Sequence, residues 1–238
     1  MGAFTIKLAL TTFLVLLSIA WLRLLYVLPR FRARPNKRQR GSPTHLLVVL
    51  GSGGHTAEMM YMLDNAVRPR LNWSDYTHRT WVVSSGDSVS ALRAKQFEDK
   101  IHTQKGSNCG TYEVVTVPRA RKIYQPLWTS PFTCLHCGWE CVRLLAWGKN
   151  GFPDLVMTNG PATATVLIFT TVLLRYFNLK GCHSQGKMRS IYVESWARVK
   201  GMSLSGRLLC WVADRVLVQW EQLKGAGGRA EYHGVLCF

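Results

Sequence analysis

The chain has 238 residues, 47% of them hydrophobic and 18% charged, which is enough apolar material for one sizeable core but not for several large domains. Its formal net charge of +17 favours anionic partners such as phosphorylated substrates, acidic lipid headgroups or nucleic acid. Seven cysteines, an odd number without paired spacings, argue against a disulfide-stabilised secreted fold and indicate a reducing compartment.

Residues 1–29 predict a transmembrane anchor. Residues 4–28 are apolar apart from Lys7 and Arg23, and a helix of that length spans the hydrocarbon core of a bilayer. The alternative is a cleaved signal peptide. The apolar run is long for a signal peptide, and no convincing cleavage site precedes the basic residues that follow.

Residues 30–43 are interpreted as a basic linker next to the membrane. Seven Lys and Arg side chains fall within 18 residues around it: Arg23, Arg30, Arg32, Arg34, Lys37, Arg38 and Arg40. Because basic residues flanking a span remain in the cytosol, we expect residues 30–238 on that side. The glycosylation acceptor sequence at Asn72 would then be inert, and a glycan on Asn72 would contradict this topology.

Apolar runs alternate with helical segments over the rest of the chain. The run 45–50 lacks polar alternation, which is typical of a parallel strand buried on both faces. Further strands are predicted at residues 80–84, 112–117, 154–158, 190–193 and 215–219. Helices are predicted from about residue 56 and at residues 88–97, 131–147, 163–177 and 205–213. This order predicts an α/β fold with a Rossmann-like parallel sheet over residues 44–238.

The loop after the first strand, Gly51-Ser52-Gly53-Gly54-His55-Thr56, is the strongest candidate for a ligand site. Glycines let the backbone approach an anion, and the following helix N-terminus offers free N–H groups. The spacing matches neither the dinucleotide nor the P-loop fingerprint. His55 lies where a proton donor or acceptor beside a phosphate is expected, with a structural histidine as the equal alternative, and Thr56 is expected to cap the helix.

Polar residues follow other predicted strands as well. The loop from Asn159 through Gly160 to Thr163 could hold a ligand, or could be a turn in which Thr163 caps the next helix. Glu194 follows the strand at 190–193, where a carboxylate is often a structural acceptor of backbone N–H groups. Asp87 is placed either to hold a ribose or to cap the helix that begins at residue 88.

A cluster of metal-ligand residue types occurs at Cys134, His136, Cys137 and Cys141. The three cysteines share one face of a predicted helix, so we interpret them as small core residues and predict no metal. The basic run at residues 116–122 is interpreted as a solvated face that could meet phosphate or lipid headgroups.

Several of these segments occur together, and in this order, in one enzyme family. They are residues 49–59, 154–161, 192–195 with Arg198, 203–206 and 214–220. Together they resemble the membrane-anchoring subunit of the UDP-N-acetylglucosamine transferase of the dolichol pathway, which adds the second sugar to the dolichol-linked glycan. The resemblance covers residues 44–238. It implies a protein of the endoplasmic reticulum membrane with its domain in the cytosol.

The resemblance also implies that two different proteins bind the acceptor and the donor of the reaction. The anchoring subunit is similar to the acceptor half of a GT-B transferase, and a separate soluble subunit holds UDP-GlcNAc, so no cofactor is expected on this chain. The acceptor diphosphate would lie against Gly51, Ser52, Gly53, Gly54, Thr56, Asn159, Gly160, Thr163 and Arg198. His55 would be the general base or a diphosphate contact, with Glu194 nearby as the alternative base. The C-terminal residues Val235, Leu236, Cys237 and Phe238 would dock the partner subunit.

The sequence departs from the family pattern at three places. Ala162 replaces an expected glycine, Lys122 replaces a common acid, and residues 182–189 form an insertion. Other functions stay open at this point: a pure membrane scaffold without catalytic residues, and a membrane-attached nucleic-acid-binding protein suggested by the charge. A nicotinamide oxidoreductase is disfavoured by the glycine spacing.

Overall fold

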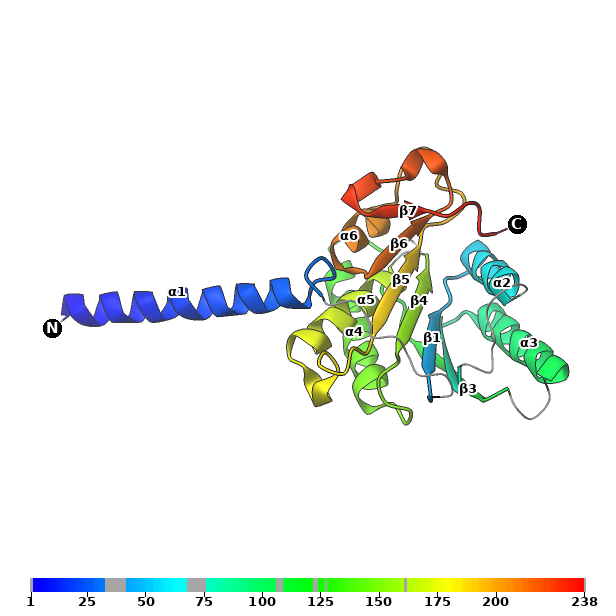
Figure 1. The fold of residues 1–238 in the computed structure, drawn as a ribbon, viewed down its shortest axis with the longest axis horizontal. Coiled ribbons are helices and arrows are strands. Elements are labelled where there is room, and N and C mark those ends of the chain that lie inside the picture. The colour runs from blue at the N-terminus through cyan, green and yellow to red at the C-terminus, as the bar shows by residue number, and fades with distance from the viewer. Residues whose placement is uncertain are drawn as a thin grey trace.

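The structure is a computed structural model that describes residues 2–32, 42–67, 76–105, 109–121, 124–126, 128–160 and 162–237. Four features discussed above lie outside these residues: the acceptor sequence at Asn72, Lys122, Phe238 and residues 33–41 of the linker. The described residues form an α/β domain from which one long helix projects (Figure 1).

A seven-stranded sheet in the order β3-β2-β1-β4-β5-β6-β7 forms the centre of the domain, and every neighbouring pair is parallel. The strands are β1 (His45–Val49), β2 (His78–Ser84), β3 (Thr111–Val117), β4 (Leu155–Asn159), β5 (Arg189–Val193), β6 (Arg215–Val218) and β7 (Ala230–Tyr232). The order confirms the predicted Rossmann-like class. It also places the switch point of the sheet, where ligands of such folds bind, between β1 and β4.

Helices cover both faces of the sheet (Figure 1). They are α2 (Gly54–Val67) and α3 (Ser88–Lys105) on one face, and α4 (Ser130–Trp147), α5 (Thr163–Tyr176) and α6 (Leu204–Val212) on the other. Leu46 and Val48 of β1 pack with α2 and α3, whereas Leu47 and Val49 pack with α4 and α5. Both faces of β1 are therefore buried, which explains its uninterrupted apolar sequence.

Two predicted helix caps are wrong. Helix α2 begins at Gly54, so Thr56 lies inside its first turn, where the Thr56 hydroxyl is 2.6 Å from the Ser90 Oγ of α3. Thr163 is the first residue of α5, and its hydroxyl is 3.2 Å from the Ser84 Oγ of β2. Both hydroxyls join neighbouring elements instead of satisfying the N–H groups of their own helix.

Other structural interpretations are confirmed. Cys137 and Cys141 are fully buried in the core cluster beneath α4, as expected for small residues on an apolar helix face. Asp87 caps α3, because its Oδ1 accepts a hydrogen bond of 3.1 Å from the Ser90 amide. The predicted insertion contributes to the core, since Cys182 and Met188 are both buried.

Helix α1 (Gly2–Val27) projects away from the domain (Figure 1). Residues 4–27 are long and apolar enough to cross a membrane, and their side chains are exposed over most of the helix. Only its C-terminal end packs on the domain, where Val27 is buried against α5 and α6 residues. Burial of this end gives α1 a defined attachment to the domain.

Arg23 fixes α1 to the end of α5. Its Nε donates to the Tyr176 carbonyl at 2.9 Å and its Nη2 to the Arg175 carbonyl at 3.0 Å. Carbonyls at a helix C-terminus lack partners within the helix and carry the negative end of the helix dipole. The Arg23 guanidinium therefore donates hydrogen bonds to both carbonyls and places a positive charge beside the negative end of the helix dipole.

The carboxylate of Asp214, which is largely but not fully buried, lies close to this junction. Arg32 reaches it at 3.1 Å, and Arg175 and Arg189 each reach it at 3.2 Å. Burial opposes ionisation of this carboxyl, but the guanidinium groups of Arg175 and Arg32 hold the pKa of Asp214 below its usual range. One carboxylate thus balances several cations and links the segment after α1 to α5 and β5.

Candidate functional site

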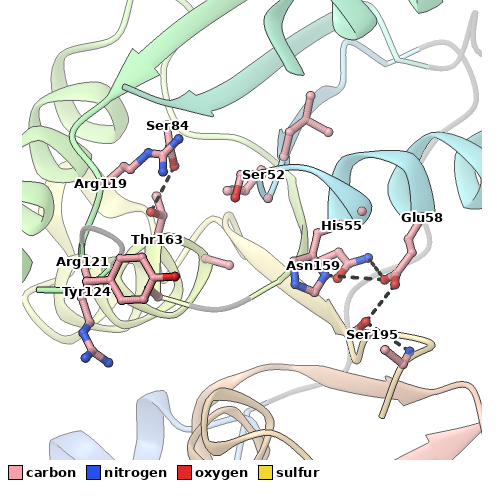
Figure 2. A pocket seen from close by; sticks show the side chains of 17 residues that line it. Ser52, His55, Glu58, Ser84, Arg119, Arg121, Tyr124, Asn159, Thr163 and Ser195 are labelled. Atoms are coloured by element: carbon pink, nitrogen blue, oxygen red, sulfur yellow. Dashed lines mark hydrogen bonds and ion pairs between the residues drawn. The ribbon is translucent and has the colours of Figure 1, made fainter. Parts of the chain in front are cut away.

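A cavity of about 700 Å³ opens at the carboxyl edge of the sheet, at the switch point between β1 and β4. Residues at or directly after the carboxyl ends of β1, β2, β3, β4 and β5 line it. Figure 2 shows their side chains. Its polar lining consists of Ser52, His55, Glu58, Ser84, Arg119, Arg121, Tyr124, Asn159, Thr163 and Ser195. The predicted candidate loops after β1 and β4 therefore face the same space.

His55 is held between two glycines. A Cβ atom on Gly51 would lie 2.7 Å from the His55 Cβ, and one on Gly160 would lie 3.1 Å from the His55 Cγ. Gly160 also has a φ of 93°, a backbone conformation that residues other than glycine rarely adopt. Glycine is needed at both positions because the backbones of both loops approach the imidazole. The sequence had instead predicted that the glycines let the backbone approach an anion.

Glu58, which the sequence analysis did not single out as a site residue, completes this wall of the cavity. Its Oε2 lies 3.7 Å from the His55 Nδ1 and accepts a hydrogen bond of 2.9 Å from the Asn159 Nδ2. Its Oε1 accepts a hydrogen bond of 2.8 Å from the Ser195 Oγ. Figure 2 shows these four side chains together at one end of the cavity. His55 and Glu58 are three residues apart on one helix, and this spacing is the sequence signal that could have predicted their contact.

The carboxylate of Glu58 is charged at neutral pH. Burial opposes ionisation, but the neighbouring imidazole and the hydrogen bonds from Asn159 and Ser195 hold the pKa of Glu58 below its usual range. A fixed negative charge beside Nδ1 favours the imidazole tautomer that carries its proton there and leaves Nε2 as a proton acceptor. The pair can therefore accept a proton from a substrate hydroxyl.

A second wall carries positive charge. Arg119 and Arg121 lie after β3, together with Tyr124, on the side of the cavity away from His55 (Figure 2). The Arg119 Nε donates to the Ser85 carbonyl at 2.9 Å. The basic run at residues 116–122 was predicted to be a solvated face. Its Arg119 and Arg121 form part of the cavity wall.

Most of the predicted ligand-binding residues lie at this cavity or beside it. Gly51, Ser52, Gly54, His55, Asn159 and Thr163 line it. Gly53 and Gly160 belong to the same two loops, and Thr56 lies in the first turn of α2 with its hydroxyl towards α3. Arg198 is exposed and is not among the described residues that line the cavity.

The structure does not bring Glu194 to the cavity. Only 1% of it is exposed, and its Oε2 accepts hydrogen bonds of 3.0 Å from both the amide and the hydroxyl of Ser203. Ser203 in turn caps α6. This corrects the predicted position of Glu194 among the reacting groups and supports its alternative interpretation as a structural acceptor of N–H groups.

The predicted docking tail is partly packed on the domain. Cys237 is buried in the cluster formed by α2, α3 and their strands, and the Leu236 amide donates to the Gln219 Oε1 at 3.4 Å. Val235 is 36% exposed. The tail therefore runs alongside α2, the helix that carries His55.

Ala162 has a φ of 55°, in the left-handed region that favours glycine. The resemblance implies glycine at this position, and this positive φ is a physical reason for it. We expect Ala162→Gly to raise the free energy of unfolding by about 1 kcal/mol or less, because relief of strain is partly offset by loss of a methyl contact with the core. Urea unfolding checks this, and a destabilised variant would contradict the strain at Ala162.

Gly51→Ala is expected to lower the rate of any reaction that uses His55 by about 10–100-fold, because the new methyl would displace the imidazole. Steady-state kinetics measures this effect. Gly201→Ala is the matched control, since a Cβ there meets no atom within 4 Å. Equal rates for the two variants would contradict the packing role of Gly51.

The fold and the cavity define a Rossmann-like α/β protein with a ligand site at the switch point of its sheet. A family model described as "Oligosaccharide biosynthesis protein Alg14 like" matches residues 46–236. The chain belongs to this family, as the resemblance predicted.

Curated relatives match over nearly the whole chain. The UDP-N-acetylglucosamine transferase subunit ALG14 of Yarrowia lipolytica is 40% identical over 237 residues, covering 98% of each chain. The subunit of the same name from Debaryomyces hansenii is 37% identical over 228 residues, covering 92% of this chain and 91% of its own. Among solved structures, MurG of Acinetobacter baumannii is similar with a TM-score of 0.47 and 13% identity; the match covers 79% of this chain and 44% of MurG.

Proposed function

We propose that the chain is the membrane-anchoring, acceptor-binding subunit of a two-subunit UDP-GlcNAc transferase. The acceptor is GlcNAc-diphosphodolichol, which receives its second GlcNAc at the cytosolic face of the endoplasmic reticulum. A soluble partner subunit, recruited by this chain, holds UDP-GlcNAc, so that this chain needs no cofactor of its own. The names of the curated relatives as transferase subunits support both the reaction and the need for a partner.

The observation that carries the proposal is the His55–Glu58 pair at the switch-point cavity. The acceptor hydroxyl attacks the anomeric carbon of the donor, a new C–O bond forms there, and the bond to the UDP oxygen breaks. The hydroxyl proton passes to the His55 Nε2, while Glu58 stabilises the imidazolium. Attack opposite the leaving group inverts the anomeric configuration.

Helix α1 supports the membrane part of the proposal. It is a single apolar helix of sufficient length at the N-terminus, and Arg23 and Val27 attach it firmly to the domain. Arg30 and Arg32 follow directly, which favours a cytosolic position for the domain by the positive-inside rule.

The test is to purify the full chain from its membrane with and without its co-purifying partner and to measure transfer from UDP-GlcNAc to a GlcNAc-diphosphate lipid. We expect transfer from the complex and little from the chain alone. A complex without transfer would refute the proposal. A complex whose rate is insensitive to changes in the cavity would favour a pure scaffold.

A further inference from the structure

Charge is unevenly distributed over the cavity. Its described lining contains one carboxylate, Glu58, and two guanidinium groups, Arg119 and Arg121. Glu58 lies beside His55 and accepts hydrogen bonds from Asn159 and Ser195, so its negative charge is held at this wall of the cavity. The described residues of the opposite wall include no carboxylate, and this leaves the cavity with a positive side.

Arg119 and Arg121 keep most of their donors available. Among the described residues, the Arg119 guanidinium donates only through Nε, to the Ser85 carbonyl, and the Arg121 guanidinium donates through Nη2 to the Gln125 carbonyl at 3.1 Å. Neither has an ion-pair partner within the part of the chain that the structure describes. Arg79 shows the contrast, since Glu98 neutralises it at 2.7 Å in the core.

We propose that Arg119 and Arg121 bind the diphosphate of the lipid-linked acceptor, an assignment that rests on the function proposed above. A diphosphate diester carries two negative charges, and guanidinium groups bind phosphate oxygens through paired N–H donors. The glycine loop at Gly51 adds backbone N–H groups but no side-chain cation.

This assignment orients the acceptor across the cavity. Figure 2 shows Arg119 beside Ser84 and Thr163, across the cavity from His55. In this assignment the diphosphate lies at the arginine wall and the sugar extends to His55. The role of His55 is thereby limited to the reacting hydroxyl. Tyr124, which is 97% exposed at the arginine wall, lies on the side from which the lipid chain leaves.

The assignment is tested in the purified complex with an Arg119→Ala/Arg121→Ala double variant. We expect the KM for a GlcNAc-diphosphate lipid to rise about tenfold to a hundredfold, while kcat changes less than about threefold. Inorganic diphosphate should inhibit the wild type competitively with the acceptor and should inhibit the double variant correspondingly less. An Arg119→Lys/Arg121→Lys variant should recover part of the affinity, because lysine retains the charge without the paired donors.

The controls separate the possible failures. Arg93→Ala, on the exposed side of α3 and outside this cavity, should leave the KM for the acceptor unchanged. An unchanged acceptor KM in a folded double variant would overturn the assignment, and so would a rise in the KM for UDP-GlcNAc instead, since the site would then hold the nucleotide. A wild-type complex without any transfer would instead refute the proposed function itself.

Discussion

His55→Ala should lower kcat for GlcNAc transfer by about 100- to 10,000-fold, the range expected for loss of a general base. The KM values for both substrates should change little, because the arginine wall and the partner subunit would still bind them. His136→Ala is the matched control, since His136 is exposed on α4 and lies outside the described cavity lining. Single-turnover kinetics of the complex measures the chemical step directly.

Glu58→Gln should give a smaller loss, about tenfold to a hundredfold, because Asn159 and Ser195 can still hold the amide while the charge beside His55 is gone. If His55→Ala retained the wild-type rate, the cavity would bind the acceptor without supplying the base. If Glu58→Gln alone were inactive, Glu58 itself would be the base.

Asp214→Asn should lower the free energy of unfolding by about 3–5 kcal/mol, since it leaves the buried guanidinium groups of Arg32 and Arg175 without their counter-charge. Urea unfolding of the detergent-solubilised chain, followed by tryptophan fluorescence, measures the change. Asp64→Asn, which removes an exposed ion pair with Lys100, is the control and should cost less than about 1 kcal/mol.

Low pH should remove the stabilisation that the charged carboxylate of Asp214 provides. The pKa of Asp214 is lower in the folded chain than its ordinary value of 3.8, so its contribution is fully present above that value and is lost as the pH falls below it. The variant should therefore lose less stability than the wild type between pH 5 and pH 3. Parallel losses in both proteins would show that Asp214 does not hold this charge cluster together.

The fold could be predicted because its signals are local. Six of the seven strands contain a short apolar run, such as residues 81–83 of β2, and helical segments separate these runs, so that the alternation predicts a parallel sheet. The strand β7 was missed, since three residues such as Ala230–Tyr232 are too few to show a period. Helix ends were displaced by up to eight residues at α3, where polar residues after Phe97 carry no boundary signal.

The site was harder to predict because it is assembled from side chains distant in sequence. The loops at Gly51 and Asn159 were found through their glycines, but their common contact with His55 depends on the strand order. At the end of β5 the sequence predicted Glu194 as a site residue, whereas its neighbour Ser195 lines the cavity. Successive residues at a strand end point in opposite directions, so an error of one position exchanges a structural side chain for a site residue.

Helix α5 connects the cavity with helix α1. Its first residue, Thr163, lines the cavity, and the carbonyls of Arg175 and Tyr176 at its other end hold Arg23 of α1, about 21 Å away for 14 residues. A helix of this length is a stiff rod bonded at both ends. In the proposed setting, this rod fixes the distance between the membrane anchor and the cavity that takes the lipid-linked sugar.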